Sequence, residues 1–135
     1  MGAADGINYR TTPKWADRVQ ELTDKHGADL VVDVGGKSTL DQSTQSLADS
    51  GTLAVLGGLT GYDGVIPAGS VLSKGAQVQG IFNGSRTDAL KMGTFIATHH
   101  LKPVIDRTFS FDQYQEALAY FRSGNFVGKV VIKVN

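Results

Sequence analysis

Two stretches of the chain decide its fold: LVVDVGG, residues Leu30–Gly36, and TLAVLGG, residues Thr52–Gly58. Each is a short apolar run, rich in β-branched residues, that ends in two glycines. Such runs are typical of strands buried on both faces of a parallel sheet. Between them, a helix is predicted from about Leu40 to Leu47. The order strand–helix–strand predicts a βαβ unit with parallel strands and a right-handed crossover.

Further helices and strands are predicted on both sides of this unit. Ser85 with Asp88 has the spacing of a capping box and opens a helix that runs to about His99. Ser110 with Gln113 has the same spacing and opens another helix. The remaining predictions are a short strand at 6–9, a helix from Thr12–Pro13 to Gly27, a loop at 59–69, strands at 76–82 and 127–134, an extended segment at 104–109, and a helix stop at Gly124.

The composition is typical of a globular domain. Hydrophobic residues make up 41% of the 135 residues and charged residues 19%, and 13 Lys and Arg balance 13 Asp and Glu. A neutral chain offers no electrostatic footprint for nucleic acid or an anionic membrane. The absence of cysteine excludes disulfides and zinc–thiolate sites within the chain. With neither a long apolar run nor a signal-peptide pattern at Met1–Asp5, we expect a soluble, cytoplasmic protein.

Three ligand-binding motifs are approached but not completed. Gly36-Lys37-Ser38 ends like a phosphate-binding P-loop, but Val31 stands where that motif needs its first glycine. The dinucleotide fingerprint G-x-G-x-x-G is absent. Residues 32–36 resemble the first motif of S-adenosylmethionine-dependent methyltransferases, although Ser38 replaces a further glycine. A methyltransferase-like domain therefore stays open as an alternative.

Several single residues could be taken for functional groups but are interpreted as structural. His99 and His100 are adjacent, so on a helix they point about 100° apart and cannot chelate one metal ion well. Asp33 lies within an apolar strand and is expected to accept structural hydrogen bonds. Trp15 is interpreted most simply as a core residue. The hydroxyls between Ser38 and Ser50 lack a partner histidine in a recognisable motif, so no nucleophile is predicted.

Six segments, spread from one end of the chain to the other, carry a family resemblance. Taken in order, they resemble the C-terminal portion of the medium-chain dehydrogenase/reductase superfamily, which includes zinc-type alcohol dehydrogenases and quinone oxidoreductases. The segments are Gly2–Arg10, Gly27–Gly36, Gly51–Gly58, Gly80–Arg86, Lys102–Arg107 and Ser123–Ile132.

The resemblance implies an α/β fold: a partial Rossmann fold, that is, a doubly wound parallel sheet lacking its first strands, with a C-terminal helix–strand extension. Residues 1–101 would form the C-terminal part of the NAD(P)-binding domain, and residues 102–135 the return segment that belongs to the catalytic domain of the parent protein. The rest of that catalytic domain, and the strands with the glycine fingerprint, would lie outside this fragment. Zinc ligands of zinc-using members also lie there, so no metal ligand is expected here.

The resemblance also implies which residues face a nicotinamide cofactor. In a doubly wound sheet, ligands sit at the carboxyl ends of the strands, where glycine permits close approach of the backbone. A plainer interpretation is that paired glycines merely end strands. Tyr9 resembles a tyrosine near the adenosine 2′-phosphate and favours NADP. Asn125 and Lys129 match a C-terminal segment that closes over the cofactor in this family. The predicted cofactor-binding residues are Tyr9, Val34, Gly35, Gly36, Gly57, Gly58, Leu59, Phe82, Asn83, Asn125 and Lys129.

The function implied for the parent is hydride transfer between the nicotinamide of NAD or NADP and a small-molecule substrate: an alcohol, an aldehyde or ketone, or a quinone or enone. No catalytic residue is predicted in this chain, which alone is expected to be inactive. The alternative is a non-catalytic domain that serves dimerisation or weak nucleotide binding. We expect a homodimer or higher oligomer formed through residues 78–82, because pairing would cover an open sheet edge. No nucleic acid or membrane partner is expected.

Overall fold

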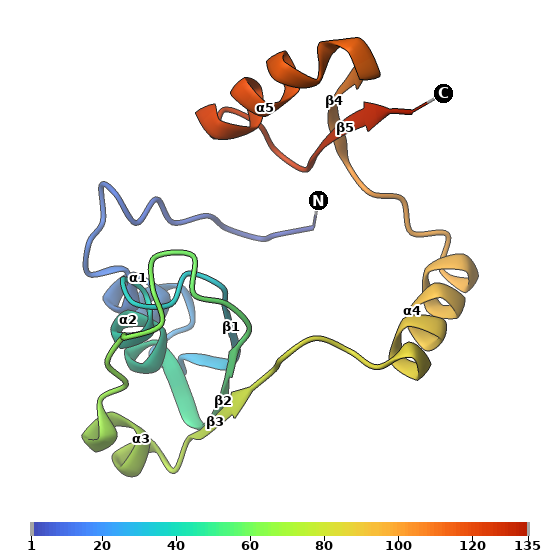
Figure 1. Ribbon diagram of the computed structural model, residues 1–135. Helices are drawn as coiled ribbons and strands as arrows, with labels where there is room; N and C mark the ends of the chain where they lie inside the picture. Colours follow the sequence, from blue (N-terminus) through green and yellow to red (C-terminus); the bar gives the residue numbers. More distant parts are fainter. Residues whose placement is uncertain (1, 135) are drawn as a thin grey trace. The chain divides into compact units, whose positions relative to one another are not determined.

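The computed structural model describes residues 2–134, which form two compact units, one that ends at Asn83 and one that begins at Gly84. Each unit is described by itself below, and Figure 1 traces the chain through both. The first unit is built on a three-stranded sheet and the second on a two-stranded sheet. The predicted division after residue 101, between the Rossmann part and the return segment, stays a prediction.

The first unit contains the βαβ arrangement expected from the two glycine-ended strands. Its strands are β1 (Ala28–Asp33), β2 (Leu47–Val55) and β3 (Gln77–Gly80), in the order β1-β2-β3. All pairings are parallel, with Asp33 opposite Val55 and Val55 opposite Gly80. The strands therefore end together, and the turns that follow them lie at one edge of the sheet. The α/β class and the parallel sheet are confirmed.

Three helices accompany this sheet: α1 (Trp15–Leu22), α2 (Leu40–Gln45) and α3 (Ala68–Lys74). Leu40 of α2 packs on Leu47 and Leu53 of β2, and these three side chains form the buried core. The helix α1 is tied to α2 by a hydrogen bond of 3.0 Å from the Ala16 N–H to Gln42 Oε1. The predicted helix between the two strands is therefore present and packs against the sheet.

Three local predictions were wrong. The short strand at residues 6–9 is not formed; instead Asn8 O accepts the N–H groups of Thr11 and Thr12, which closes a turn. The helix α3 begins inside the predicted loop at 59–69. The strand β2 begins at Leu47, five residues before the predicted start at Thr52, because Leu47 pairs with Ala28 of β1 ahead of an irregularity after which the pairing resumes at Thr52.

The prediction of strands buried on both faces is correct for β2 and wrong for β1. In β2, Leu53 and Ala54 point to opposite faces and are 0% and 5% exposed. In β1, Leu30 and Val32 share one face and are 61% and 55% exposed. The face of β1 that carries Leu30 and Val32 is thus uncovered, whereas both faces of the central strand β2 are covered. Because β1 is an outer strand in the order β1-β2-β3, one of its edges is unpaired within the described sheet.

The second unit contains a smaller βαβ arrangement. Its elements are α4 (Arg86–Thr98), β4 (Ile105–Ser110), the 3-10 turn η1 (Phe111–Gln113), α5 (Tyr114–Ser123) and β5 (Lys129–Lys133), and β4 pairs with β5 in parallel. Both predicted capping boxes are formed, before α4 and before η1. The predicted helix stop at Gly124 is confirmed by its left-handed φ of 68°.

A hydrogen-bonded brace links the elements of the second unit. The Tyr120 hydroxyl of α5 donates to Asp106 Oδ2 of β4 at 2.7 Å, and the Val127 N–H donates to Asp106 Oδ1 at 3.2 Å. The Tyr120 hydrogen bond is the main cause that lowers the pKa of Asp106, and the same bond raises the pKa of Tyr120. The Arg107 guanidinium lies 4.8 Å from the Phe109 ring and 5.4 Å from the Tyr120 ring. The brace thus favours the ionised form of Asp106.

This brace predicts how the second unit responds to acid. Because the folded state lowers the pKa of Asp106, its stabilisation is complete above the unfolded value of about 3.9 and is lost as pH falls through the folded value. Tyr120→Phe removes the hydrogen bond that is the main cause of the lowered Asp106 pKa. The variant should therefore lose less free energy of unfolding between neutral and acidic pH than the wild type does. Urea titrations between about pH 6 and pH 3, followed by the amide NMR signals of β4 and β5, measure this. Tyr114→Phe serves as the control, and an unchanged acid dependence in Tyr120→Phe would show that the brace is not linked to folding.

Candidate functional site

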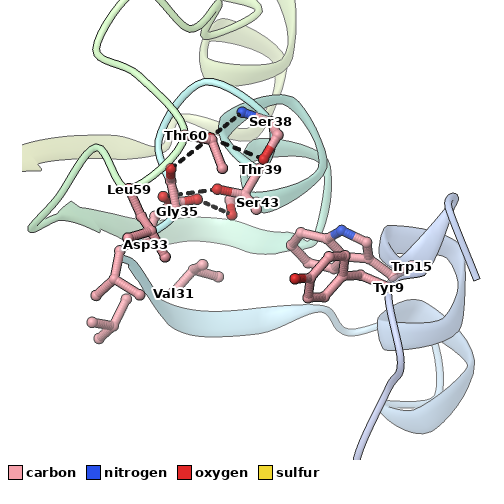
Figure 2. Close-up of a pocket in the computed structure, with 12 residues that line it drawn as sticks. Tyr9, Trp15, Val31, Asp33, Gly35, Ser38, Thr39, Ser43, Leu59 and Thr60 are labelled. Atoms are coloured by element: carbon pink, nitrogen blue, oxygen red, sulfur yellow. Dashed lines mark hydrogen bonds between the residues drawn. The ribbon is translucent and has the colours of Figure 1, made fainter. Parts of the chain in front are cut away.

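Two cavities open in the first unit at the carboxyl ends of its strands. The cavity beside β1, which we call the β1 cavity, has a volume of about 410 Å³, and the cavity between β2 and β3, the β2–β3 cavity, has about 560 Å³. Both are in the size range of small-ligand sites. The β1 cavity, drawn in Figure 2, is lined by Tyr9, Trp15, Val31, Val32, Asp33, Val34, Gly35, Ser38, Thr39, Ser43, Leu59 and Thr60. The β2–β3 cavity is lined by Val55, Leu56, Gly57, Tyr62, Gly80, Ile81, Phe82 and Asn83.

A buried carboxylate organises the turn after β1. Asp33 is 3% exposed, and its Oδ1 accepts the Gly36 N–H at 2.8 Å. Two hydroxyls complete the set: Thr39 Oγ1 donates to Oδ1 at 3.0 Å and Ser43 Oγ donates to Oδ2 at 2.5 Å. The expected structural hydrogen-bonding role of Asp33 is therefore confirmed. It ties the end of β1 to the turn and to α2.

Gly36 is the point where the two glycine turns meet. Its φ of 79° is left-handed, and a Cβ atom there would collide with the Gly61 carbonyl oxygen and stand 2.7 Å from Gly58 Cα. A glycine is needed here both for the backbone angle and for the close approach of the second loop. The Gly36 carbonyl then accepts the N–H groups of Thr39 and Leu40, which starts α2.

Thr60, in the loop after β2, is hydrogen-bonded to the turn after β1. Its hydroxyl donates to the Gly35 carbonyl at 2.7 Å and accepts the Ser38 N–H at 3.0 Å. Ser38 Oγ also lies 3.0 Å from Thr60 Oγ1, and the Thr60 N–H donates to the Gly35 carbonyl at 2.8 Å. The dashed lines of Figure 2 show this bridge at the rim of the β1 cavity.

The backbone N–H groups at the start of α2 are all hydrogen-bonded within the protein. Five consecutive N–H groups, from Gly36 to Leu40, donate to protein oxygens at 2.8–3.0 Å. A phosphate-binding nest needs several converging N–H groups that are free to point at the anion. This turn therefore lacks the donors of a P-loop, which agrees with the misplaced glycine in the sequence.

The β2–β3 cavity is apolar and aromatic. The ring of Tyr62 lies against Gly58, where a Cβ atom would come within 2.5 Å of two ring carbons. Tyr62 and Phe82 are 90% and 93% exposed, and Asn83 has a left-handed φ of 51°. Exposed aromatic rings around a concave surface are suited to contact with a flat ligand ring.

The structure distributes the predicted cofactor-binding residues over several places. Tyr9, Val34, Gly35 and Leu59 line the β1 cavity, while Gly57, Phe82 and Asn83 line the β2–β3 cavity. Gly36 and Gly58 lie in the contact between the two loops rather than in either lining. Asn125 and Lys129 belong to the second unit, where the Asn125 carbonyl oxygen lies 3.1 Å from the Tyr120 hydroxyl oxygen and the Lys129 N–H donates to the Val104 carbonyl.

Four cavity residues were missed or misjudged from the sequence. Trp15, interpreted as core, is only partly buried and lines the β1 cavity beside Tyr9. Ser38 and Thr60 form the bridge described above, and Tyr62 covers Gly58. Serine and threonine in loops are common, so their types alone carry no signal. Their position just after the glycine pairs is the only clue in the sequence.

The described residues offer no site for a metal ion. Within residues 2–134, no three His, Cys, Asp or Glu side chains are grouped as metal ligands. The described residues therefore do not provide the ligands of a zinc site. In the same part of the chain, no helix combines the length and apolar character that crossing a membrane requires.

Comparisons with known proteins agree with this fold. The family described as "Zinc-binding dehydrogenase" matches residues 1–132. A zinc-type alcohol dehydrogenase-like protein of Schizosaccharomyces pombe is 36% identical over all of this chain and 40% of its own length. A quinone oxidoreductase-like protein 2 homolog of Nematostella vectensis is 30% identical over 98% of this chain and 39% of its own length. A solved structure from Sinorhizobium meliloti, described as an alcohol dehydrogenase, has 39% identity and a TM-score of 0.86 over 98% of this chain and 38% of its own.

The parallel sheet, the crossover helix and the glycine turns at the strand ends define a Rossmann-like α/β domain. The chain belongs to the zinc-binding dehydrogenase family, within the medium-chain dehydrogenase/reductase superfamily of oxidoreductases, and corresponds to a C-terminal portion of it. It spans about two fifths of the length of the curated relatives it matches.

The contact at Gly36 predicts a large effect of a small substitution. Gly36→Ala places a methyl group against the Gly61 carbonyl at a left-handed φ, so it should destabilise the first unit by at least about 2 kcal/mol. Gly69→Ala is the matched control, because nothing lies near its Cβ position in α3, and it should stabilise by up to about 1 kcal/mol. Urea unfolding followed by the fluorescence of Trp15, the single tryptophan, measures both. Equal effects of the two substitutions would contradict the contact.

Proposed function

We propose that this chain is part of the NAD(P)-binding domain of an oxidoreductase. The parent would transfer hydride between a nicotinamide and an alcohol, an aldehyde or ketone, or a quinone or enone. The observation that carries the proposal is the meeting of two glycine turns, clamped at Gly36, beside two cavities at the carboxyl ends of parallel strands. The names of relatives support it, including a NAD-dependent alcohol dehydrogenase of Sulfolobus acidocaldarius that is 29% identical over 96% of this chain.

The residues present fit the nicotinamide end of such a cofactor better than its pyrophosphate. The β2–β3 cavity offers the exposed rings of Phe82 and Tyr62 to a flat ligand ring. The five committed N–H groups at the start of α2 cannot serve a pyrophosphate. When bound, the cofactor would supply the hydride chemistry. This chain would orient the ring and exclude water around it.

We also propose that catalysis belongs to the full-length parent. The chain covers about two fifths of its relatives, and the fingerprint for pyrophosphate is not in its sequence. A non-catalytic domain for dimerisation or weak nucleotide binding is therefore the second candidate for the chain alone. The edge position of β3 favours dimerisation through residues 78–82, because Val78 and Ile81 expose apolar surface there.

Cofactor binding should depend on Leu59 but not on an equally exposed leucine elsewhere. Leu59 lines the β1 cavity at 88% exposure, whereas Leu72 lies on α3 at 84% exposure. In calorimetric titrations the wild-type chain should bind NADH saturably, with an affinity near millimolar, or about 4 kcal/mol. Leu59→Ala should weaken binding roughly tenfold through lost apolar contact, and Leu72→Ala should leave it unchanged. A folded wild-type chain that binds neither NADH nor NADPH would leave only a non-catalytic domain for dimerisation.

The choice between NAD and NADP is proposed to rest on Tyr9. This residue is 60% exposed at one end of the β1 cavity, so its hydroxyl is available to a 2′-phosphate. Tyr9→Phe should weaken NADPH binding roughly tenfold, since hydrogen bonds to charged groups contribute about 1.5–3 kcal/mol, and should spare NADH. Parallel titrations with the two cofactors provide the internal control. An equal change for both would assign Tyr9 to packing instead.

A further inference from the structure

The direction of each hydrogen bond at the Ser38–Thr60 bridge is settled by one carbonyl group. A carbonyl can only accept, so the single hydroxyl proton of Thr60 must point to Gly35 O, 2.7 Å away. With its proton committed, Thr60 Oγ1 can only accept from Ser38, and it does so from both the backbone N–H and the hydroxyl, each at 3.0 Å. The Ser38 proton is therefore committed as well.

This order of protons decides what the rim of the β1 cavity offers to a ligand. Ser38 is exposed and lines the cavity, and with its proton turned to Thr60 only its lone pairs face outward. Thr39 and Ser43, whose hydroxyls lie next to this rim, donate to the buried Asp33 carboxylate. The rim is thus an acceptor surface made of hydroxyl groups.

The neighbouring donors are also occupied. The N–H groups from Gly36 to Leu40 all donate to protein oxygens, and the Lys37 ammonium is paired with Asp63 at 2.7 Å. A phosphate group carries only acceptor oxygens at neutral pH apart from one titrating proton, so it would meet acceptor oxygens at this rim. A hydroxyl or carboxamide N–H₂ of a ligand would instead find an unused lone pair.

We propose that the Ser38–Thr60 rim selects ligand groups that donate hydrogen bonds, ribose hydroxyls above all, and rejects phosphates. Ser38 Oγ is the contacting acceptor, and Thr60 is a positioning residue that sets the direction of the Ser38 proton. The ribose assignment rests on the proposed cofactor function. Tyr9 lies at the other end of the cavity and is outside this rim (Figure 2).

The test compares two ligands that differ by one phosphate, reduced nicotinamide riboside and reduced nicotinamide mononucleotide, on the 135-residue chain. Amide NMR titrations follow Ser38, Thr60 and the residues between them. Ser38→Ala should weaken riboside binding roughly two- to tenfold, the loss of one neutral hydrogen bond. Thr60→Val releases the Ser38 N–H and hydroxyl protons, so the ratio of mononucleotide to riboside affinity should rise at least roughly threefold. Thr60→Ser keeps the hydroxyl and should restore the wild-type ratio.

Each outcome separates a selective rim from a structural role. If Thr60→Val weakens both ligands equally, or if inorganic phosphate shifts the Ser38 and Thr39 amide signals of the wild-type chain, the proposal is overturned. Riboside shifts at Ser38 without binding of NADH would support the rim and remove the cofactor function. Binding of NADH that leaves the Ser38 and Thr60 signals unmoved would support the cofactor function and overturn the rim proposal. A wild-type chain that binds neither riboside nor NADH would overturn both.

Discussion

The buried carboxylate of Asp33 is the constraint on which the candidate site depends. None of the ion pairs recorded among residues 2–134 includes Asp33, so hydrogen bonds must compensate its desolvation. The donors come from Gly36 in the turn and from Thr39 and Ser43 at α2. The end of β1, the turn and the helix are thereby held in one arrangement. The turn can then meet the second loop only because position 36 has no side chain.

In this arrangement the backbone N–H groups that many nucleotide-binding turns leave free for a phosphate are hydrogen-bonded within the protein. The amide groups at the start of α2 satisfy Asp33, Thr60 and the Gly61 carbonyl. What stays accessible at the carboxyl edge is apolar and aromatic surface together with hydroxyl lone pairs. A site of this kind suits an uncharged ring and a sugar. Such a surface is compatible with the proposed role of this chain in binding part of a nicotinamide cofactor.

The sequence predicted the backbone of this structure well wherever the signal is local. The capping boxes at Ser85 and Ser110 and the helix stop at Gly124 depend on residues within a few positions of one another, and all three are formed. The glycine turns follow the carboxyl ends of β1 and β2, as the sequence predicts, and the family resemblance of the ordered segments is confirmed. The loop prediction before α3 failed because a glycine in a polar stretch does not prevent a short helix that starts after Pro67.

Amino-acid order alone therefore determined the two glycine-ended strands and the helix between them, the parallel βαβ pattern and the need for glycine after these strands. These follow from side-chain periodicity and backbone sterics, which act over a few residues. Tertiary structure decided that Leu30 and Val32 are uncovered, that Trp15 borders a cavity, and that Thr60 orients Ser38. Exposure depends on which strand becomes the edge, and the Thr60–Gly35 bond joins residues 25 positions apart. Only the folded chain brings such groups within hydrogen-bonding distance, where a single carbonyl can set the direction of two protons.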